Sequence, residues 1–68
     1  MSKLNITVNG KKQEIDQNTT INNLLKELNI NSKMFVVERN CQIIQKENFD
    51  WIIEDGDNIE IVIFCGGG

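Results

Sequence analysis

The sequence contains no histidine, and its only two cysteines, Cys41 and Cys65, lie far apart without a CxxC spacing. This leaves no pattern for a zinc site or a disulfide framework, so we expect no bound metal and two reduced thiols. No nucleophile stands in a recognisable arrangement with a base, so we expect no catalytic residue. With 68 residues the chain forms one small domain, too short for a deep catalytic cleft.

A long apolar run and a concentration of basic residues are also missing. No segment approaches the length of a membrane span, and the N-terminus lacks the apolar core of a signal peptide, so we expect a cytoplasmic protein that does not contact membranes. The formal net charge is −3 and the lysines are scattered along the chain, which argues against nucleic-acid binding. An acidic protein of this kind is better suited to docking on a basic patch of a protein partner.

What the sequence does have is a short glycine tail directly after a strand-like run. The tail consists of Cys65, Gly66, Gly67 and Gly68. Glycine has no side chain, so a partner enzyme can thread such a tail, roughly 13 Å long when extended, into a narrow active site. A terminal carboxylate, with a pKa of about 3.5, is ionised at neutral pH. A frayed terminus would explain the tail alone equally well. We expect a folded domain of residues 1–64 and a flexible tail of residues 65–68.

The first part of the chain has the pattern of a hairpin followed by a helix. Polar and apolar residues alternate through residues 3–8, and the Asn9-Gly10 pair favours a tight turn, so residues 12–16 are expected to return as an antiparallel strand. Thr19 and Thr20 can cap a helix. We expect about three helical turns, because apolar residues recur at helical spacing in Ile21, Leu24, Leu25 and Leu28.

A second hairpin is expected in the middle of the chain. Residues 34–39 have the pattern of a strand, which turns at Asn40 and Cys41 and returns through residues 42–44. Residues 45–53 are expected to form an irregular segment or a single helical turn that closes one end of the core.

The terminal strand, residues 58–64, follows a turn at Asp55-Gly56-Asp57 and is apolar on both of its faces. Such a strand usually lies centrally in its sheet, and the first strand is expected to lie parallel beside it. The order of elements therefore predicts an α+β fold, with helix and sheet as two layers around one core.

This order of elements resembles the ubiquitin-like β-grasp fold, a mixed sheet of four to five strands packed on one main helix. Four segments also resemble the thiamine-biosynthesis sulfur carriers, the ThiS family, namely residues 36–40, 43–44, 55–62 and 64–68. The likeness is specific because the Asp-Gly-Asp turn, the strand and the terminal glycines occur together. One departure is Cys41, which stands where the family often has glycine, so we do not expect a simple two-residue turn there.

The resemblance implies that the protein is a co-substrate and not an enzyme. Gly68 would be adenylated and converted to a thiocarboxylate, Gly67 would be its unhindered neighbour, and Gly66 would extend the threading tail. A ubiquitin-activating-type adenylyltransferase would use ATP and magnesium for this step, with no cofactor held permanently by the carrier. A sulfur donor such as a cysteine desulfurase would supply the sulfur, and thiazole synthase would receive it. The carrier alone would be a monomer.

The resemblance also implies docking contacts on the folded domain. Holding three glycines extended costs roughly 1–2 kcal/mol each in backbone entropy, which docking must offset. We expect these contacts around Phe64, Glu60 and Asp57. An acid–base pair formed by Asp55 and Asp57 is the weaker interpretation, since two carboxylates beside a turn glycine usually shape the turn.

Three other functions fit the same residues. The small subunit of molybdopterin synthase also ends in two glycines, and a sulfur carrier of another pathway would have the same tail. A β-grasp protein-binding module with an inert tail belongs to a different class. Truncation of Gly67 and Gly68 separates it from a carrier, because a module would keep its partner while a carrier would lose all activity with its fold intact.

Overall fold

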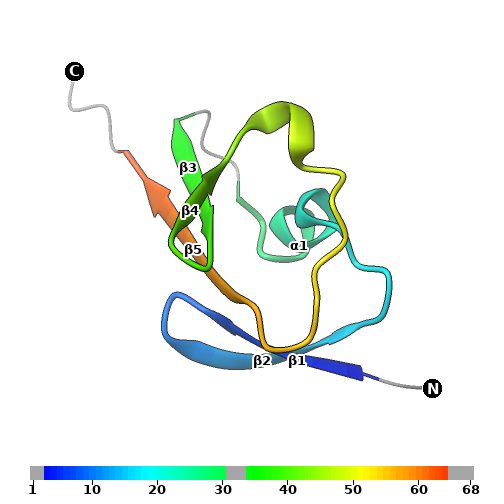
Figure 1. The fold of residues 1–68 in the computed structure, drawn as a ribbon. Helices are drawn as coiled ribbons and strands as arrows, with labels where there is room; N and C mark the ends of the chain where they lie inside the picture. The colour runs from blue at the N-terminus through cyan, green and yellow to red at the C-terminus, as the bar shows by residue number, and fades with distance from the viewer. Residues whose placement is uncertain (1–2, 31–33, 65–68) are drawn as a thin grey trace.

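The fold is a mixed sheet with one helix packed on one of its faces (Figure 1). The computed structural model describes residues 3–30 and 34–64. Within them five strands lie in the order β2-β1-β5-β3-β4. In chain order the elements are β1 (Lys3–Val8), β2 (Lys11–Asp16), α1 (Ile21–Glu27), β3 (Phe35–Arg39), β4 (Gln42–Ile44), the single 3-10 turn η1 (Lys46–Asn48) and β5 (Asn58–Ile63). The predicted α+β architecture is confirmed.

β1 and β2 form the predicted antiparallel hairpin. Its turn residues Asn9 and Gly10 have φ values of 49° and 83°, and this left-handed pair is typical of a type I′ turn. The alternation along β1 places Ile6 and Val8 in the core, where both side chains are buried. The hairpin therefore presents one apolar face to the helix layer.

The open end of this hairpin is joined by an ion pair between Lys3 and Asp16. The hydrogen bond and the negative charge of Asp16 raise the pKa of Lys3 above its ordinary value. A raised lysine pKa means that the interaction is fully present at neutral pH and is lost only as the pH rises through that pKa. Both side chains are exposed, so the pair adds little stability.

α1 begins with a capping box. The backbone N–H of Asn23 donates to Thr20 Oγ1 at 3.1 Å, and the backbone N–H of Thr20 donates to Asn23 Oδ1 at 3.3 Å. The helix has seven residues, about two turns, and the expectation of three turns was wrong. It ends because Asn29 adopts a left-handed conformation with φ of 57°. No helix among the described residues is long and apolar enough to cross a membrane.

The second hairpin turns at Asn40 and Cys41, as predicted, but the turn is tighter than the cysteine at this position led us to expect. β3 and β4 are joined by Asn40 and Cys41 alone, with φ values of 51° and 71°. The prediction that Cys41 would prevent a simple two-residue turn was therefore wrong. Asn40 explains the outcome, because its backbone N–H donates to the carbonyl oxygen of Asn58 at 2.8 Å and its Oδ1 accepts from the Asn58 N–H at 2.9 Å. These bonds to β5 hold the turn in place.

β5 occupies the centre of the sheet, as predicted. It pairs in parallel with β1 and antiparallel with β3. Its residues Ile59 and Ile61 point into the core and are buried. The buried cluster around them consists of Ile6, Val8, Ile15, Ile21, Leu24, Leu25, Val37, Ile44, Phe49 and Ile53.

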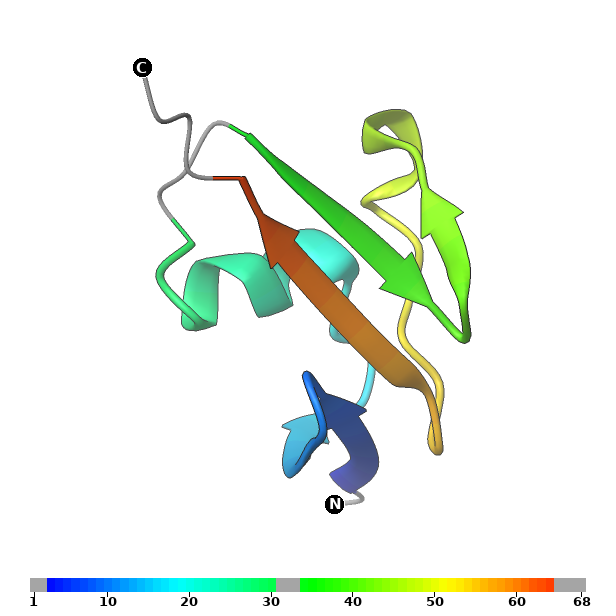
Figure 2. The same ribbon diagram turned by 90° about the vertical axis from the view of Figure 1, so that its left-hand side faces the viewer.

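The segment between β4 and β5 is irregular apart from η1, in agreement with the sequence. Phe49 and Ile53 close one end of the core, whereas Trp51 and Ile52 are about half exposed. α1 and this segment lie on the same side of β3, β4 and β5, and the opposite side of these three strands carries no other element of the described chain (Figures 1 and 2). We call that opposite side the outer face.

Candidate functional site

The described chain ends at Phe64, the residue from which the glycine tail leaves the domain. The backbone N–H of Phe64 donates to the carbonyl oxygen of Met34 at 2.9 Å, which continues the pairing of β5 with the start of β3. The predicted tail residues Gly66, Gly67 and Gly68, together with Cys65, lie outside the described residues. Phe64 is therefore the base of the tail, and the structure defines its position.

On its other side β5 is held by Asn9, the first residue of the β1–β2 turn. Asn9 Oδ1 accepts a hydrogen bond from the backbone N–H of Ile61 at 2.7 Å, and Asn9 Nδ2 donates to the Ile61 carbonyl at 3.3 Å. The backbone N–H of Asn9 donates to the carbonyl of Ile59 at 2.9 Å. The Asn9 side chain therefore acts in place of a further β1 residue, and β5 is bonded on both sides as far as Ile61.

Asp57, a predicted docking residue, lies inside the structure. Its carboxylate is only 7% exposed and accepts three hydrogen bonds. The donors are Arg39 Nε at 2.8 Å, Asn40 Nδ2 at 3.1 Å and the backbone N–H of Glu54 at 2.9 Å. The structure therefore assigns Asp57 to joining the second hairpin to the start of β5, and its oxygens are not open to a partner.

Glu60 and Phe64, the other two predicted docking residues, lie on the surface. Glu60 is on the outer face, because its neighbours Ile59 and Ile61 point inward. The register pairs Glu60 with Glu38 of β3 and pairs Val62 with Val36. By the same alternation Phe64, 49% exposed, projects on the side of Val62.

The outer face is largely apolar, and sequence reasoning had missed most of it. Ile43 of β4 is paired with Glu38 and is 63% exposed, and Met34 beside Phe64 is 58% exposed. We define the outer patch by its exposed or half-exposed apolar residues, Met34, Val36, Ile43, Val62 and Phe64. The alternation of residues 34–39 could have indicated the apolar stripe of Met34 and Val36. Only the pairing of β3 with β5 reveals that this stripe lies beside a second one, formed by Val62 and Phe64.

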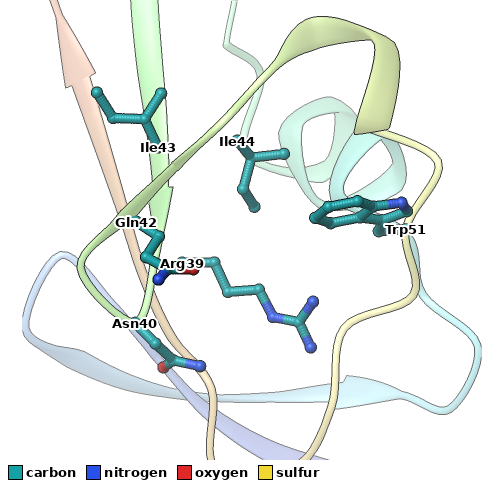
Figure 3. A pocket seen from close by; sticks show the side chains of 6 residues that line it. All are labelled: Arg39, Asn40, Gln42, Ile43, Ile44 and Trp51. Atoms are coloured by element: carbon teal, nitrogen blue, oxygen red, sulfur yellow. The ribbon is translucent and has the colours of Figure 1, made fainter.

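A small pocket lies beside the turn of the second hairpin and is partly lined by Trp51 (Figure 3). Its volume is about 280 Å³. The lining residues are Arg39, Asn40, Gln42, Ile43, Ile44 and Trp51. Arg39 is already paired with Asp57 at 2.8 Å and lies 3.6 Å from Glu54, so its charge is neutralised by the protein itself. The pocket offers an indole surface but no free charged group to recognise a ligand.

Residues that bind metals are not gathered in the part of the chain that the structure describes. No group of three or more His, Cys, Asp or Glu side chains there could hold an ion. What the described residues do present at the end of β5 is an exposed apolar face that also carries Glu38 and Glu60.

Comparisons with known proteins agree with one another. A model of the ThiS family matches residues 5–68. The chain is 42% identical over 65 residues to the sulfur carrier protein ThiS of Bacillus subtilis, and the match covers 93% of this chain and 98% of that protein. It is 36% identical over 66 residues to a thiazole synthase of Paramagnetospirillum magneticum, covering 96% of this chain and 20% of that protein. The chain thus spans about a fifth of that synthase.

A solved structure gives the same result. The crystal structure of the thiamine biosynthesis protein ThiS from Geobacter metallireducens matches with a TM-score of 0.78 and 35% sequence identity. The match covers 96% of this chain and all of that one, at 100%. The predicted ubiquitin-like β-grasp fold is thereby confirmed.

Proposed function

The chain belongs to the ThiS family, and we propose that it is a sulfur carrier for the thiazole part of thiamine, with Gly68 as the residue that carries the sulfur. The observation that carries this proposal is the extent of the family match, which runs through residue 68 and so includes the glycine tail. The similarity to the Bacillus subtilis carrier over nearly its whole length supports the same conclusion.

The proposed chemistry takes place on the terminal carboxylate. A carboxylate oxygen of Gly68 attacks the α-phosphorus of ATP, the bond to the β-phosphate breaks, and pyrophosphate leaves. Sulfide-level sulfur then displaces AMP from the resulting acyl adenylate, which leaves a thiocarboxylate. A ubiquitin-activating-type adenylyltransferase binds the ATP and magnesium, and a donor such as a cysteine desulfurase supplies the sulfur as a persulfide, from which a thiol reductant releases it as sulfide while the donor and thiol sulfurs form a disulfide. Thiazole synthase accepts the sulfur from the thiocarboxylate.

The carrier's own contribution is access and positioning. Gly66 and Gly67 place no side chain between the domain and the reacting carboxyl, so a narrow channel can admit them. β5 is hydrogen-bonded to β3 as far as Phe64 and to Asn9 as far as Ile61, which supports a fixed starting point for the tail. Phe64 and Glu60 on the surface remain the docking residues in this proposal.

The relatives also bear on the choice between pathways. The reported matches are a thiamine carrier, a thiazole synthase and a thiamine biosynthesis protein. These names favour the thiazole pathway over molybdopterin synthesis or another thiolation pathway for this chain.

Intact mass spectrometry tests the proposal. The protein is incubated with ATP, magnesium, sulfide and the adenylating enzyme of the same organism, and we expect one oxygen to be replaced by sulfur at Gly68. A variant that lacks Gly67 and Gly68 serves as the control and should remain folded and unmodified. An unmodified wild-type mass, with the protein folded and the enzyme active on ATP, would refute the carrier function.

A further inference from the structure

We propose that Glu38 and Glu60 together form an acceptor for an arginine side chain of the protein that docks on the outer face, and that this protein is thiazole synthase. The inference rests on the proposed function and adds to it the chemistry by which the partner is recognised. It concerns the folded domain, not the tail.

The first observation is the register of the sheet. Glu38 of β3 and Glu60 of β5 are directly paired. Side chains so paired lie on the same face, with Cβ atoms about 4.5–5.5 Å apart. Two carboxylates in this position repel each other, and a sheet gains nothing in stability from the pair.

The second observation is that no cation among residues 3–30 and 34–64 pairs with either carboxylate to relieve this repulsion. In the described parts of the chain the ion pairs are Lys3 with Asp16 and Arg39 with Asp57 and Glu54. Neither Glu38 nor Glu60 takes part in any of them. Arg39 is adjacent to Glu38 in sequence, but it points inward to Asp57, as strand alternation requires. The two charges are thus left for an external partner.

The third observation is the apolar frame around the pair. On the outer face Val36 and Val62 form the next cross-strand pair towards the tail, and Ile43 is paired with Glu38 on the β4 side. When a partner covers these side chains, water is removed and a charge interaction between them becomes stronger than it would be in solvent. An arginine suits this position better than a lysine, because its planar guanidinium can donate to two carboxylates at once.

The position of the pair favours a partner that also handles the tail. Glu60 is four residues before Phe64, roughly 13 Å along an extended strand. A protein that covers the outer face therefore sits at the base of the tail (Figure 2). Thiazole synthase is our choice because a segment resembling this chain occurs within the thiazole synthase of Paramagnetospirillum magneticum, so that a carrier-like domain and a synthase are parts of one polypeptide there.

The test uses the full chain and purified thiazole synthase of the same organism. The isosteric variants Glu38→Gln, Glu60→Gln and the double variant are titrated into the synthase by calorimetry at low and moderate salt, and their thermal midpoints are measured without partner. We expect the double variant to bind at least about tenfold more weakly, with a smaller salt dependence. Its thermal midpoint should be equal to or higher than that of the wild type, because a repulsion has been removed.

Glu47→Gln is the matched control. Glu47 is exposed on η1, away from the outer face, and its replacement changes the net charge as much as either single variant does. Its affinity should stay within about twofold of wild type, since a rim or remote charge contributes little to a docked complex.

Each other result would overturn the inference. Equal binding by wild type and double variant would show that the pair is not an acceptor, and a fall in both affinity and thermal midpoint would show a structural role. Absence of binding by the wild type would show that thiazole synthase does not dock on the outer face. Self-association of the wild type in sedimentation experiments would show that a second copy of this chain covers that face instead. None of these binding results depends on whether Gly68 is thiolated. The carrier function is therefore tested separately, by mass spectrometry.

Discussion

Asn9 forms a two-way hydrogen bond with the backbone of Ile61, accepting from its N–H at 2.7 Å and donating to its carbonyl at 3.3 Å. Asn9 also has a φ of 49°, so one residue both makes the tight turn of the first hairpin and prolongs the pairing of the central strand. Glycine could adopt the positive φ that the turn requires, but it has no side chain to bond to Ile61 of the central strand.

Asn9→Gly separates these two roles. The backbone stays relaxed, but the two side-chain bonds to Ile61 are lost, and we expect unfolding in urea to show a loss of about 1–2 kcal/mol. Amide exchange at Ile61 should become faster. Asn18→Gly is the control, since Asn18 also has a positive φ, 67°, and that variant should be neutral or slightly more stable. Equal effects of the two variants would contradict this role of the Asn9 side chain.

Asp57→Asn should destabilise the protein by about 2 kcal/mol or more, because it removes the charge that Arg39 faces in a nearly buried position. Chemical denaturation measures the change. Asp50→Asn, at an exposed position, should shift the free energy of unfolding by less than about 0.5 kcal/mol. Thiolation of Gly68 should survive at a temperature where the Asp57 variant is folded. If the folded Asp57→Asn variant lost thiolation selectively, Asp57 would have to be a docking residue after all.

Cys41→Gly should stabilise the protein by about 1 kcal/mol, because glycine adopts the φ of 71° without the steric cost that a side chain carries. No atom is lost from the core, since Cys41 is exposed. Cys41→Ser removes the thiol but keeps the side chain, so its thermal midpoint should match that of wild type. If the serine variant gained the same stability, the thiol and not the backbone would be the cause.

Ile61 and Val62 are neighbours on β5 that face opposite sides of the sheet. Ile61→Ala should cost about 2–4 kcal/mol of stability, since the side chain is only 7% exposed in the core. Val62→Ala, at 44% exposure, should cost less than about 1 kcal/mol but weaken docking of the synthase. Urea unfolding and calorimetric titration provide the two readings. Unchanged affinity in the Val62 variant would remove the outer patch from the docking surface.

Local patterns were sufficient to predict most of the fold. The alternation of residues 3–8, the Asn9-Gly10 turn and the two-sided apolar strand of residues 58–64 depend on neighbours in sequence, and all three were predicted correctly. The helix was overestimated because Leu28 continues the apolar spacing, whereas the chain itself turns at Asn29.

The errors at the site arose from contacts between distant residues. The Asn40–Cys41 turn forms because Asn40 bonds to Asn58, and Asp57 is buried because Arg39 and Asn40 surround its carboxylate. Neither contact can be inferred from residue spacing. The pairing of Glu38 with Glu60 likewise depends on the register between β3 and β5, which are separated by a hairpin and an irregular segment.

The sheet order has a consequence for the order of events during synthesis of the chain. In the described sheet β1 pairs with β2 and β5, and β3 pairs with β4 and β5, so the two hairpins are joined only through the last strand. We therefore expect each local hairpin to be able to form before β5 joins the two, and the long-range pairing that completes the sheet to come last. Under the proposed function, a tail that follows this strand would gain its fixed starting point at Phe64 only with that last pairing, so we expect an activating enzyme to act on folded carriers.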